Sequence, residues 1–291
     1  MSRPTASSLV QEGRTALQAA GVPEPLLDAE ALLARVLAVE KSRLHTHPET
    51  PVGNDEAARY RDLVARRAAR QPLQYLTGVQ EFWSLSFRVT PAVLIPRPET
   101  EGLIEALLRL NRAPDPIVLD IGTGSGCLAI AAAREVPGAR VLAGDISEEA
   151  LRVARDNAAA HGVAARIDFR RGDLFGPFRG GGPGLEGRVD FVLSNPPYVG
   201  DSEFPGLMPE VRDHEPRIAL SAGPDALAVH RRLARECADF LKPGGHLIAE
   251  IGLGQEAGLL ALYGGQARLE IVAIRPDLAA IPRVLIARAR P

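Results

Sequence analysis

The stretch "VLDIGTGSGCLAI", residues 118–130, decides the fold class of this chain. A short apolar run leads into glycines at every second position, and an alanine-rich apolar segment at helical spacing follows them. Glycines at such a turn permit tight backbone conformations and let main-chain N–H groups approach a ligand. The pattern therefore predicts a strand, a ligand-binding turn and a helix. The predicted binding residues of the turn are Gly122, Thr123, Gly124, Ser125 and Gly126.

The same alternation of strands and helices continues toward the C-terminus. We expect further strands in "RVLAGD", "RIDFRRGD", "RVDFVLSN", "GGHLIAEIG", "LEIVAI" and "RVLIAR", and a helix in "SEEALRVARDNAAAHG" with Ser147 as its N-cap. This alternation indicates an α/β fold with a mostly parallel, twisted, Rossmann-like sheet. The strand "RVDFVLSN" should lie beside the first strand. Ligands of such sheets bind at the carboxyl ends of the strands.

The residues before the sheet predict a different architecture. Residues 1 to about 72 have helical periodicity, with Ser8 and Gln11 as a capping box and Asn54 as a later N-cap. The stretch "QEFWSLSFRVTPAVLI", residues 80–95, is typical of a β-hairpin or paired strands, and "PRPETEGLIEALLRL" of a helix. We therefore expect a helical domain over 1–72, a hairpin linker over 73–97 and an α/β domain over 98–291.

Composition narrows the function classes. A net charge of −2 over 291 residues disfavours a strongly basic nucleic-acid binder. The two cysteines, Cys127 and Cys237, lie far apart and predict neither a metal site nor a redox pair. No signal-peptide core and no apolar run of about 18 residues is present, so we expect a cytoplasmic protein without a membrane span. The arginine run "RYRDLVARRAAR" is either a solvated helix face or a docking face for an acidic or RNA-bearing partner.

Two acids predict the kind of ligand that the glycine turn binds. Asp145 ends the second strand, 19 residues after Gly126, where a carboxylate can accept from both ribose hydroxyls. Asp173 follows the third strand, where it can accept from an adenine amino group, with Leu174 and Ile146 on either side of the ring. A dinucleotide site needs a third glycine where Cys127 stands. These features favour a nucleoside without a pyrophosphate.

The stretch "NPPY" predicts the chemistry. Prolines cannot extend a central sheet, so the strand must end at Asn195. The side-chain carbonyl of Asn195 and the main-chain carbonyl of Pro196 are two rigid acceptors for the two hydrogens of a planar –NH₂ group, and Tyr198 offers a face for stacking. Holding both hydrogens aims a weakly nucleophilic nitrogen at an electrophile. We predict Asn195, Pro196 and Tyr198 as catalytic, Pro197 as a further substrate contact, and Asn195 also as a cofactor contact.

These motifs resemble those of the class I S-adenosylmethionine (AdoMet) methyltransferases. The stretch "QPLQYLTGVQEFWSLSFRVTPAVLIPRPETE", residues 71–101, is similar to the protein-(glutamine-N5) methyltransferases of the HemK/PrmC family, as are "NPPY", "HEPRIALSAGPDAL", "LKPGGHLIAEIGLGQ" and "DLAAIPRVLIAR". The resemblance implies AdoMet as cofactor and the Gly-Gly-Gln glutamine of class I peptide-chain release factors as substrate. It also implies a small substrate-docking helical domain before the catalytic domain. We expect a monomer with no direct nucleic-acid partner.

Several assignments stay open. The family often has an aromatic residue where this chain has Leu174, which weakens adenine stacking. Phe82 and Trp83 line the pocket mouth or form hairpin core. Three consecutive residues either contact the methionine end of AdoMet or cap a helix: Glu99, Thr100 and Glu101. Glu250 is a further candidate for contact with the methionine end.

Alternative functions also stay open. One is methylation of another planar amine, either a ribosomal-protein glutamine or a DNA or RNA base. The ribosomal-protein family shares "NPPY" but departs at "RPETE". Another alternative is a non-catalytic AdoMet-binding module that docks on translation factors.

Overall fold

The computed structural model of the chain describes residues 3–180 and 184–291. The chain forms two compact units. One contains the residues up to Val79 together with the segment Met208–His214, and the other contains Gln80–Leu207 and Glu215–Pro291. The sequence did not predict that Met208–His214 would join the N-terminal unit. The predicted domain boundaries at residues 72 and 97 stay a prediction.

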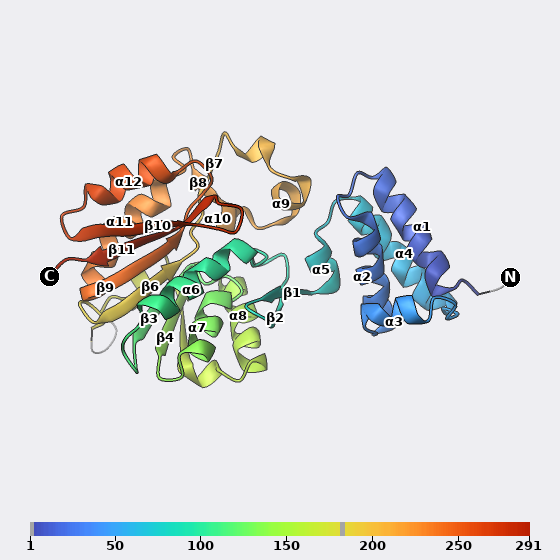
Figure 1. The fold of residues 1–291 in the computed structure, drawn as a ribbon, viewed down its shortest axis with the longest axis horizontal. Helices are drawn as coiled ribbons and strands as arrows, with labels where there is room; N and C mark the ends of the chain where they lie inside the picture. Colours follow the sequence, from blue (N-terminus) through green and yellow to red (C-terminus); the bar gives the residue numbers. More distant parts are fainter. Residues whose placement is uncertain (1–2, 181–183) are drawn as a thin grey trace. The chain divides into compact units, whose positions relative to one another are not determined.

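The first unit is helical (Figure 1). Its helices are α1 (Ala6–Ala19), α2 (Pro25–Leu37), α3 (Lys41–Thr46), α4 (Asn54–Ala68), α5 (Leu73–Thr77) and α9 (Pro209–His214). Side chains from α1, α2 and α4 form its apolar core, among them Leu9, Leu17, Leu32, Leu33 and Tyr60, none of them measurably exposed. Burial of such side chains is the main favourable contribution to the stability of the unit.

Both predicted N-caps in this unit were wrong, because each true N-cap lies earlier in the sequence: Thr5 instead of Ser8, and Gly53 instead of Asn54. Thr5 caps α1: its hydroxyl accepts from Ser8 N–H at 3.2 Å, and the Ser8 hydroxyl accepts from Thr5 N–H at 2.9 Å. Ser8 is thus the inner partner of the capping box and not its N-cap. Asn54 is the first residue of α4, and Gly53 precedes it as N-cap with its N–H donated to Glu56 Oε2 at 3.0 Å.

The arginine run on α4 does not form one free basic face. Arg67 is buried, and it donates to Asp28 Oδ2 at 2.7 Å and to Glu210 Oε1 at 2.9 Å. Arg70 donates to both oxygens of Glu210 at 2.7 Å each. Arg61 pairs with Glu12. Carboxylates of the same unit therefore neutralise much of the charge that suggested a docking face.

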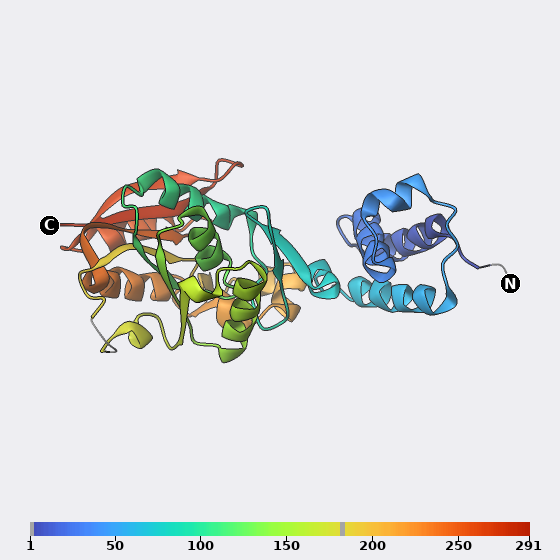
Figure 2. The same ribbon diagram turned by 90° about the horizontal axis from the view of Figure 1, so that it is seen from below.

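The second unit contains the predicted α/β sheet (Figures 1 and 2). Its strand order is β10-β11-β9-β6-β3-β4-β5. The strands are β3 (Ile117–Ile121), β4 (Arg140–Asp145), β5 (Ile167–Arg171), β6 (Val189–Ser194), β9 (Leu241–Glu250), β10 (Leu269–Pro276) and β11 (Pro282–Ala289). All neighbours pair in parallel except β11, which is antiparallel to β9 and β10. The prediction that the "RVDFVLSN" strand, β6, lies beside the first strand, β3, is confirmed.

Helices cover both faces of this sheet (Figures 1 and 2). One layer contains α6 (Glu101–Leu110), α7 (Cys127–Glu135) and α8 (Glu148–Ala160), and the other contains α11 (Ala228–Phe240) and α12 (Glu256–Gly264). Side chains alternate between the two cores along a strand, so that Val118 packs in one and Leu119 in the other. The predicted N-cap of α8 is confirmed, because Ser147 Oγ accepts from Ala150 N–H at 3.1 Å.

The predicted hairpin is present as β1 (Val79–Phe82) and β2 (Leu85–Arg88), shorter than residues 80–95. Its turn residues, Trp83 and Ser84, have φ values of +53° and +55°. Trp83 is held there, since its main-chain N–H donates to Glu101 at 2.7 Å and its indole N–H donates to Glu135 at 2.9 Å. The remaining short elements are β7 (Val199–Gly200), β8 (Ser221–Gly223), α10 (Arg217–Leu220) and the 3₁₀ turns η1 (Pro98–Thr100), η2 (Ala164–Arg166), η3 (Gly176–Phe178) and η4 (Phe204–Gly206).

Candidate active site

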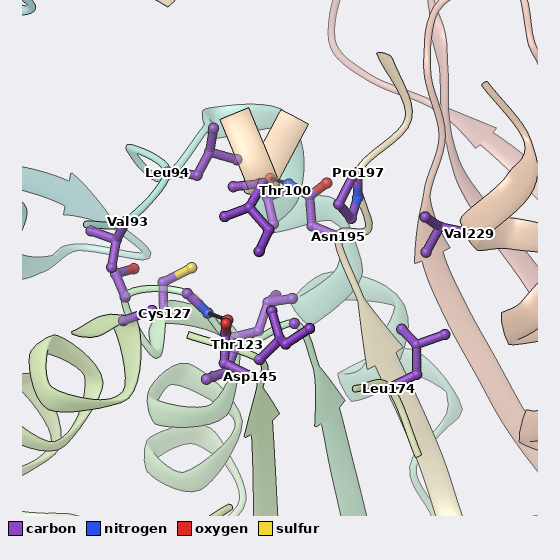
Figure 3. Close-up of a pocket in the computed structure, with 18 of the residues that line it drawn as sticks. Val93, Leu94, Thr100, Thr123, Cys127, Asp145, Leu174, Asn195, Pro197 and Val229 are labelled. Atoms are coloured by element: carbon purple, nitrogen blue, oxygen red, sulfur yellow. Dashed lines mark hydrogen bonds between the residues drawn. The ribbon is translucent and has the colours of Figure 1, made fainter. Parts of the chain in front are cut away.

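A cavity of about 240 Å³ lies at the carboxyl ends of β3, β4 and β6 (Figure 3). Thr123 and Asp145 lie on one side of it, Thr100, Asn195 and Pro197 on the opposite side, and Leu174 and Val229 together on a third. This is the edge of an open parallel sheet at which ligands bind. The predicted strand ends and motifs therefore meet around one space.

The glycine turn after β3 forms the floor of this cavity. Gly122, Gly124 and Gly126 have φ values of +77°, +56° and +84°, which L side chains rarely adopt. A Cβ added at Gly122 or Gly124 meets no atom within 4 Å, whereas one at Gly126 meets Ala154 Cβ and Ile130 Cδ1 at 3.1 Å each. The first two glycines thus leave open space beside the turn, and the third lets α7 and α8 pack closely.

Asp145 is anchored at the end of β4 with both oxygens engaged. Oδ2 accepts from Gly124 N–H and Oδ1 from Ser147 N–H, each at 2.9 Å. Burial raises the pKa of this carboxyl group above its usual range, although these main-chain hydrogen bonds oppose the rise. Each carboxylate oxygen has a second lone pair for a further donor. The geometry suits two neighbouring hydroxyl groups.

Asp120, at the end of β3, is a fully buried acid under the turn. Oδ2 accepts from Thr123 Oγ1 at 2.6 Å and from Ala129 N–H at 3.1 Å. Oδ1 has no hydrogen-bond partner among the described residues. Burial raises the pKa of Asp120 to about 7. An unpaired buried acceptor costs free energy, and protonation of the carboxyl group reduces that cost.

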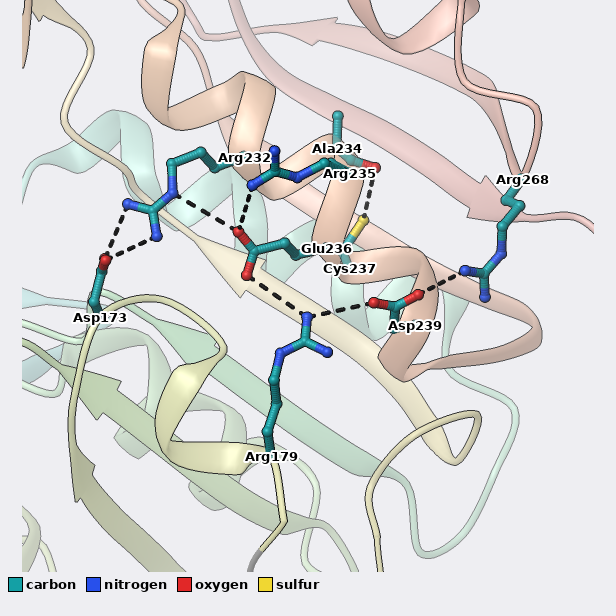
Figure 4. Close-up of polar contacts among 9 residues, drawn as sticks. All are labelled: Asp173, Arg179, Arg232, Ala234, Arg235, Glu236, Cys237, Asp239 and Arg268. Carbon is teal, nitrogen blue, oxygen red and sulfur yellow. Dashed lines mark hydrogen bonds and ion pairs between the residues drawn. The ribbon is translucent and has the colours of Figure 1, made fainter.

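Asp173 lies two residues beyond β5 and has an unpredicted partner. Arg232, on α11, donates to its two oxygens at 3.1 and 2.8 Å. The ion pairs continue outward through Glu236 to Arg179 and Asp239 (Figure 4). Both Asp173 and Arg232 line the cavity. A contact of Asp173 with adenine stays a prediction, and its carboxylate must share its lone pairs with Arg232.

Leu174 and Ile146, the residues expected on either side of an adenine ring, both line the cavity. Leu174 has a φ value of +45°, an uncommon conformation for a side chain of this size. The side chain of Ile146 is 48% exposed. The cavity wall at this end is therefore aliphatic and partly open.

The "NPPY" segment is fixed at both of its ends. Before it, Ser194 Oγ donates to Ile121 O at 2.8 Å; after it, Tyr198 O accepts from Gln255 Nε2 at 2.8 Å. Asn195 and Pro197 line the cavity, and Pro196 is buried. The catalytic roles of Asn195, Pro196 and Tyr198 stay predictions. Their backbone is preorganised, which a positioning site requires.

A hydrogen-bonded chain runs behind Asn195. Asn195 Nδ2 donates to Thr100 Oγ1 at 3.1 Å, and Thr100 Oγ1 donates to Glu250 Oε2 at 2.5 Å. Tyr198 Oη donates to Glu250 Oε1 at 3.3 Å. Glu250 is 1% exposed, and burial raises its pKa to about 7, although the hydrogen bonds from Thr100 and Tyr198 oppose the rise. The chain connects the end of β6, the turn η1 and the end of β9.

The structure also places the residues that the sequence left open. Phe82 is 1% exposed in the hairpin core, and neither it nor Trp83 lines the cavity. Glu101 accepts from Trp83, while Thr100 reaches the cavity wall. Asn157 was missed: it donates to Ser125 O at 2.9 Å and to Arg88 O at 3.0 Å. It thus connects the glycine turn to the hairpin, and no local sequence signal marks that role.

Comparison with known proteins identifies the family. Residues 8–78 match the PrmC N-terminal domain, and residues 100–207 match the methyltransferase small domain. The release factor glutamine methyltransferase of Cereibacter sphaeroides is 44% identical over 94% of this chain and 94% of that protein. The same enzyme of Streptomyces coelicolor is 40% identical over 96% of both chains. The chain belongs to the release factor glutamine methyltransferase family.

The release factor glutamine methyltransferases are AdoMet-dependent enzymes with a Rossmann-like fold, so the predicted fold class, enzyme class and cofactor are confirmed. The fold alone is also similar to the catalytic domain of hMettl16, solved with MAT2A 3′UTR hairpin 6. That likeness has a TM-score of 0.54 at 17% identity and covers 78% of this chain and 82% of that one. Among the described residues, no helix is long and apolar enough to cross a membrane.

The residues around the cavity fit AdoMet. Open space beside Gly122 and Gly124 accommodates a ligand next to the backbone, and Asp145 has acceptors for a ribose. Asp120 and Glu250 do not line the cavity, but each accepts a hydrogen bond from a threonine that does, Thr123 and Thr100 respectively, so two acids lie directly behind the cavity wall. The described residues contain no group of three or more His, Cys, Asp or Glu side chains arranged to hold a metal ion.

Proposed function

We propose that this protein methylates the side-chain amide nitrogen of the Gly-Gly-Gln glutamine in class I peptide-chain release factors. The observation that carries the proposal is the location of Asn195: it directly follows β6 and lies on the cavity wall, opposite the glycine turn and Asp145. Such an arrangement holds a planar amide against a nucleoside-bound methyl donor. Relatives at 40–44% identity over nearly the full chain are named release factor glutamine methyltransferases.

The residues divide into two groups by role. Those that would hold AdoMet are Gly122, Thr123, Gly124, Ser125, Gly126, Asp145, Asp173, Leu174 and Asn195. When bound, AdoMet supplies an electrophilic methyl group on a positively charged sulfur. Asn195 Oδ1 and Pro196 O would accept the two amide hydrogens, Pro197 would line the substrate side, and Tyr198 would stack on the amide. Two rigid acceptors orient the nitrogen and stabilise the positive charge that develops on it.

The decisive experiment combines the full-length protein, tritiated AdoMet and a recombinant release factor. One release factor is wild type, and in the other the loop glutamine is changed to alanine. Label in the wild-type factor alone supports both the reaction and the modified residue. Label in neither factor, with AdoMet binding retained, would refute the proposal and favour another planar amine, for which ribosomal protein and nucleic acid are the next substrates to assay.

A variant of Asn195 tests its role separately. We expect Asn195→Ala to lower kcat by about 100-fold or more, because loss of a positioning acceptor leaves the amide misaligned. The dissociation constant for AdoMet, measured by calorimetry, should change much less. Asn195→Asp is the comparison variant: it keeps an acceptor but loses the –NH₂ group that donates to Thr100. A kcat equal to that of the wild type in Asn195→Ala would refute the role.

We further propose that the protein acts as a monomer in the cytoplasm, with the helical unit as the docking domain for its substrate. Both cysteines are buried free thiols, which suits a reducing compartment. Sedimentation of the full chain, alone and with release factor, tests the oligomeric state; a stable homodimer would contradict it.

A further inference from the structure

We propose that Thr100 and Glu250 are positioning residues that determine which way the side-chain amide of Asn195 points, and that protonation of Glu250 abolishes this control. The inference rests on the proposed function. It concerns the hydrogen-bonded chain from Asn195 through Thr100 to Glu250, whose two links measure 3.1 and 2.5 Å.

The direction of the chain follows from the donors and acceptors present. An ionised carboxylate only accepts hydrogen bonds, so the single hydrogen of the Thr100 hydroxyl goes to Glu250. The separation of 2.5 Å suits a charge-assisted O–H···O⁻ bond. The Thr100 oxygen is then an acceptor for Asn195, and the side of the Asn195 amide that faces it must be the –NH₂ group. The carbonyl oxygen Oδ1 is left for the substrate.

This direction matters because the two ends of an asparagine amide have nearly the same shape. Rotation by half a turn about χ2 exchanges the oxygen and the nitrogen at little steric cost. The substrate amide –NH₂ group can only donate hydrogen bonds here. If Asn195 rotated in this way, its own –NH₂ group would face the substrate –NH₂ group, and no hydrogen bond could form. Only a partner that distinguishes oxygen from nitrogen can prevent the rotation, and Thr100 is that partner.

Protonation of Glu250 removes the distinction. A carboxylic acid has its own hydrogen, which it can donate to Thr100; the Thr100 hydrogen is then free to bond Asn195 Oδ1. The pKa of Glu250, raised to about 7 chiefly by burial, puts this exchange near neutral pH. Arg283 lowers that pKa and Glu99 raises it. The titratable or charged groups that interact with Glu250 or its main chain are Glu99, Cys127, Tyr198, His230 and Arg283.

A purely architectural role makes different predictions. If Thr100 and Glu250 only hold η1 against the sheet, their replacement lowers stability and AdoMet binding together, and leaves the shape of the pH profile unchanged. Orientation of Asn195 instead affects kcat, leaves AdoMet affinity nearly unchanged, and makes kcat depend on the charge of Glu250.

The test measures kcat with release factor from about pH 5.5 to about pH 9 for wild type, Thr100→Val, Thr100→Ser and Glu250→Gln. We expect the wild-type kcat to rise with an apparent midpoint near the pKa of Glu250, about 7. Thr100→Val should lower kcat by about 10- to 100-fold with the AdoMet dissociation constant within about 3-fold. Thr100→Ser, which keeps the hydroxyl, should recover most of the turnover. Glu250→Gln should lose the rising limb.

A Thr100→Val variant with wild-type kcat would overturn the inference, as would a Glu250→Gln variant with the wild-type pH limb. If Thr100→Val fails to bind AdoMet, the pH profile of Glu250→Gln tests the inference: kcat should no longer rise with pH. A wild type that transfers no methyl group to release factor refutes the proposed function instead. In that case the NMR signals of the Asn195 side-chain –NH₂ decide the inference: they should titrate in the wild type and not in Glu250→Gln.

Discussion

At the scale of single residues, Asp145 combines a structural role with a predicted binding role. It accepts two main-chain N–H groups and has one further lone pair on each oxygen. We expect Asp145→Ala to raise the AdoMet dissociation constant by about 10- to 100-fold, because hydrogen bonds to a charged group contribute about 1.5–3 kcal/mol. Calorimetric titration measures the change. Asp145→Asn keeps one acceptor and should lose less; equal affinities in all three proteins would contradict the ribose contact.

Glu250 should make the enzyme less stable as the pH rises. Its pKa in the folded protein, about 7, lies above the ordinary value of 4.5, so the folded state holds its proton more tightly than the unfolded chain does. This contribution to the free energy of unfolding is fully present below about pH 4.5 and is lost as the pH rises through about 7. Asp120, with a pKa also raised to about 7, acts in the same direction.

Glu250→Gln removes the contribution of Glu250 to the pH dependence of the free energy of unfolding. We expect its Tm, relative to that of the wild type, to be higher at about pH 8 than at about pH 5. Differential scanning calorimetry at both pH values tests this. A Tm difference that does not depend on pH would contradict the raised pKa. In that case the charge of Glu250 would not affect the stability of the fold, and a change in turnover of Glu250→Gln would need another cause.

The sequence predicted single residues where a local pattern marks them. Asn195 and Asp145 stand at strand ends beside recognisable turns, so their location on the cavity could be expected. The partners of these residues have no such signal. Thr100 and Glu250 are 150 positions apart, and Arg232 is 59 positions from Asp173. Only the tertiary fold brings them together.

At the scale of elements, the glycine turn allows a direct comparison of two substitutions. Gly126→Ala adds a methyl group 3.1 Å from Ala154 and Ile130 at a φ of +84°, whereas Gly122→Ala adds one into open space at +77°. Both should cost about 1–2 kcal/mol for the left-handed backbone. We expect the larger loss of Tm in Gly126→Ala, because it also disturbs the packing of α7 and α8.

The second measurement in this comparison is AdoMet affinity. Gly122→Ala fills space beside the turn, so we expect it to weaken AdoMet binding more than its effect on Tm would suggest. If Gly122→Ala binds AdoMet as the wild type does, the open space beside Gly122 is not part of the binding site.

Periodicity was sufficient to predict the strands of the sheet and the adjacency of β6 and β3, because buried parallel strands appear as short apolar runs between helices. Helix starts were less predictable. Near α1 both Thr5 and Ser8 are capable caps, and the main chain decides which one takes that position. The turn at Trp83 and Ser84 has no glycine to announce its positive φ values. Contacts made by Trp83 with Glu101 and Glu135 stabilise it instead.

At the scale of the whole molecule, Glu210 holds a short segment of the chain in the helical unit. It is 8% exposed and accepts from Arg67 and Arg70. Loss of one partner from a buried ion pair costs about 3–5 kcal/mol. We expect Glu210→Gln to cost about 3 kcal/mol, near the lower limit, because Asp28 still compensates Arg67. Thermal unfolding of the full chain measures the loss.

The exposed pair of Glu12 and Arg61 in the same unit provides the control. Its side chains are 49% and 51% exposed, and Glu12→Gln should change stability by at most about 1 kcal/mol. The pH dependence gives a second check. The pKa of Glu210 is lowered to about 2, so its contribution is present above about pH 4.5 and is lost as the pH falls toward 2. Equal losses in the two variants would contradict a special role for Glu210.

The sequence could not predict that Met208–His214 belongs with the N-terminal helices. The helix in this segment, α9, has only 6 residues, too few for a periodic signal. Its ion-pair partners, Arg67 and Arg70, are 143 and 140 positions away. The arginine run was visible in the sequence, but Glu210, one of the acids that neutralise it, stands in the other half of the chain.

Because Met208–His214 packs with the N-terminal helices, the two units cannot be separated by cutting the chain at one point. The backbone passes between the two units three times, after Val79, after Leu207 and after His214. A single proteolytic cut near residue 80 would therefore leave the two products associated non-covalently, because Met208–His214 of the larger product packs with the N-terminal helices. A recombinant fragment that begins at residue 80 would retain α9 but deprive Glu210 of both arginines. Truncation at residue 80 thus leaves Glu210 without its arginine partners, in the same fragment as "NPPY". Any lost activity of that fragment would not by itself measure what the helical unit contributes.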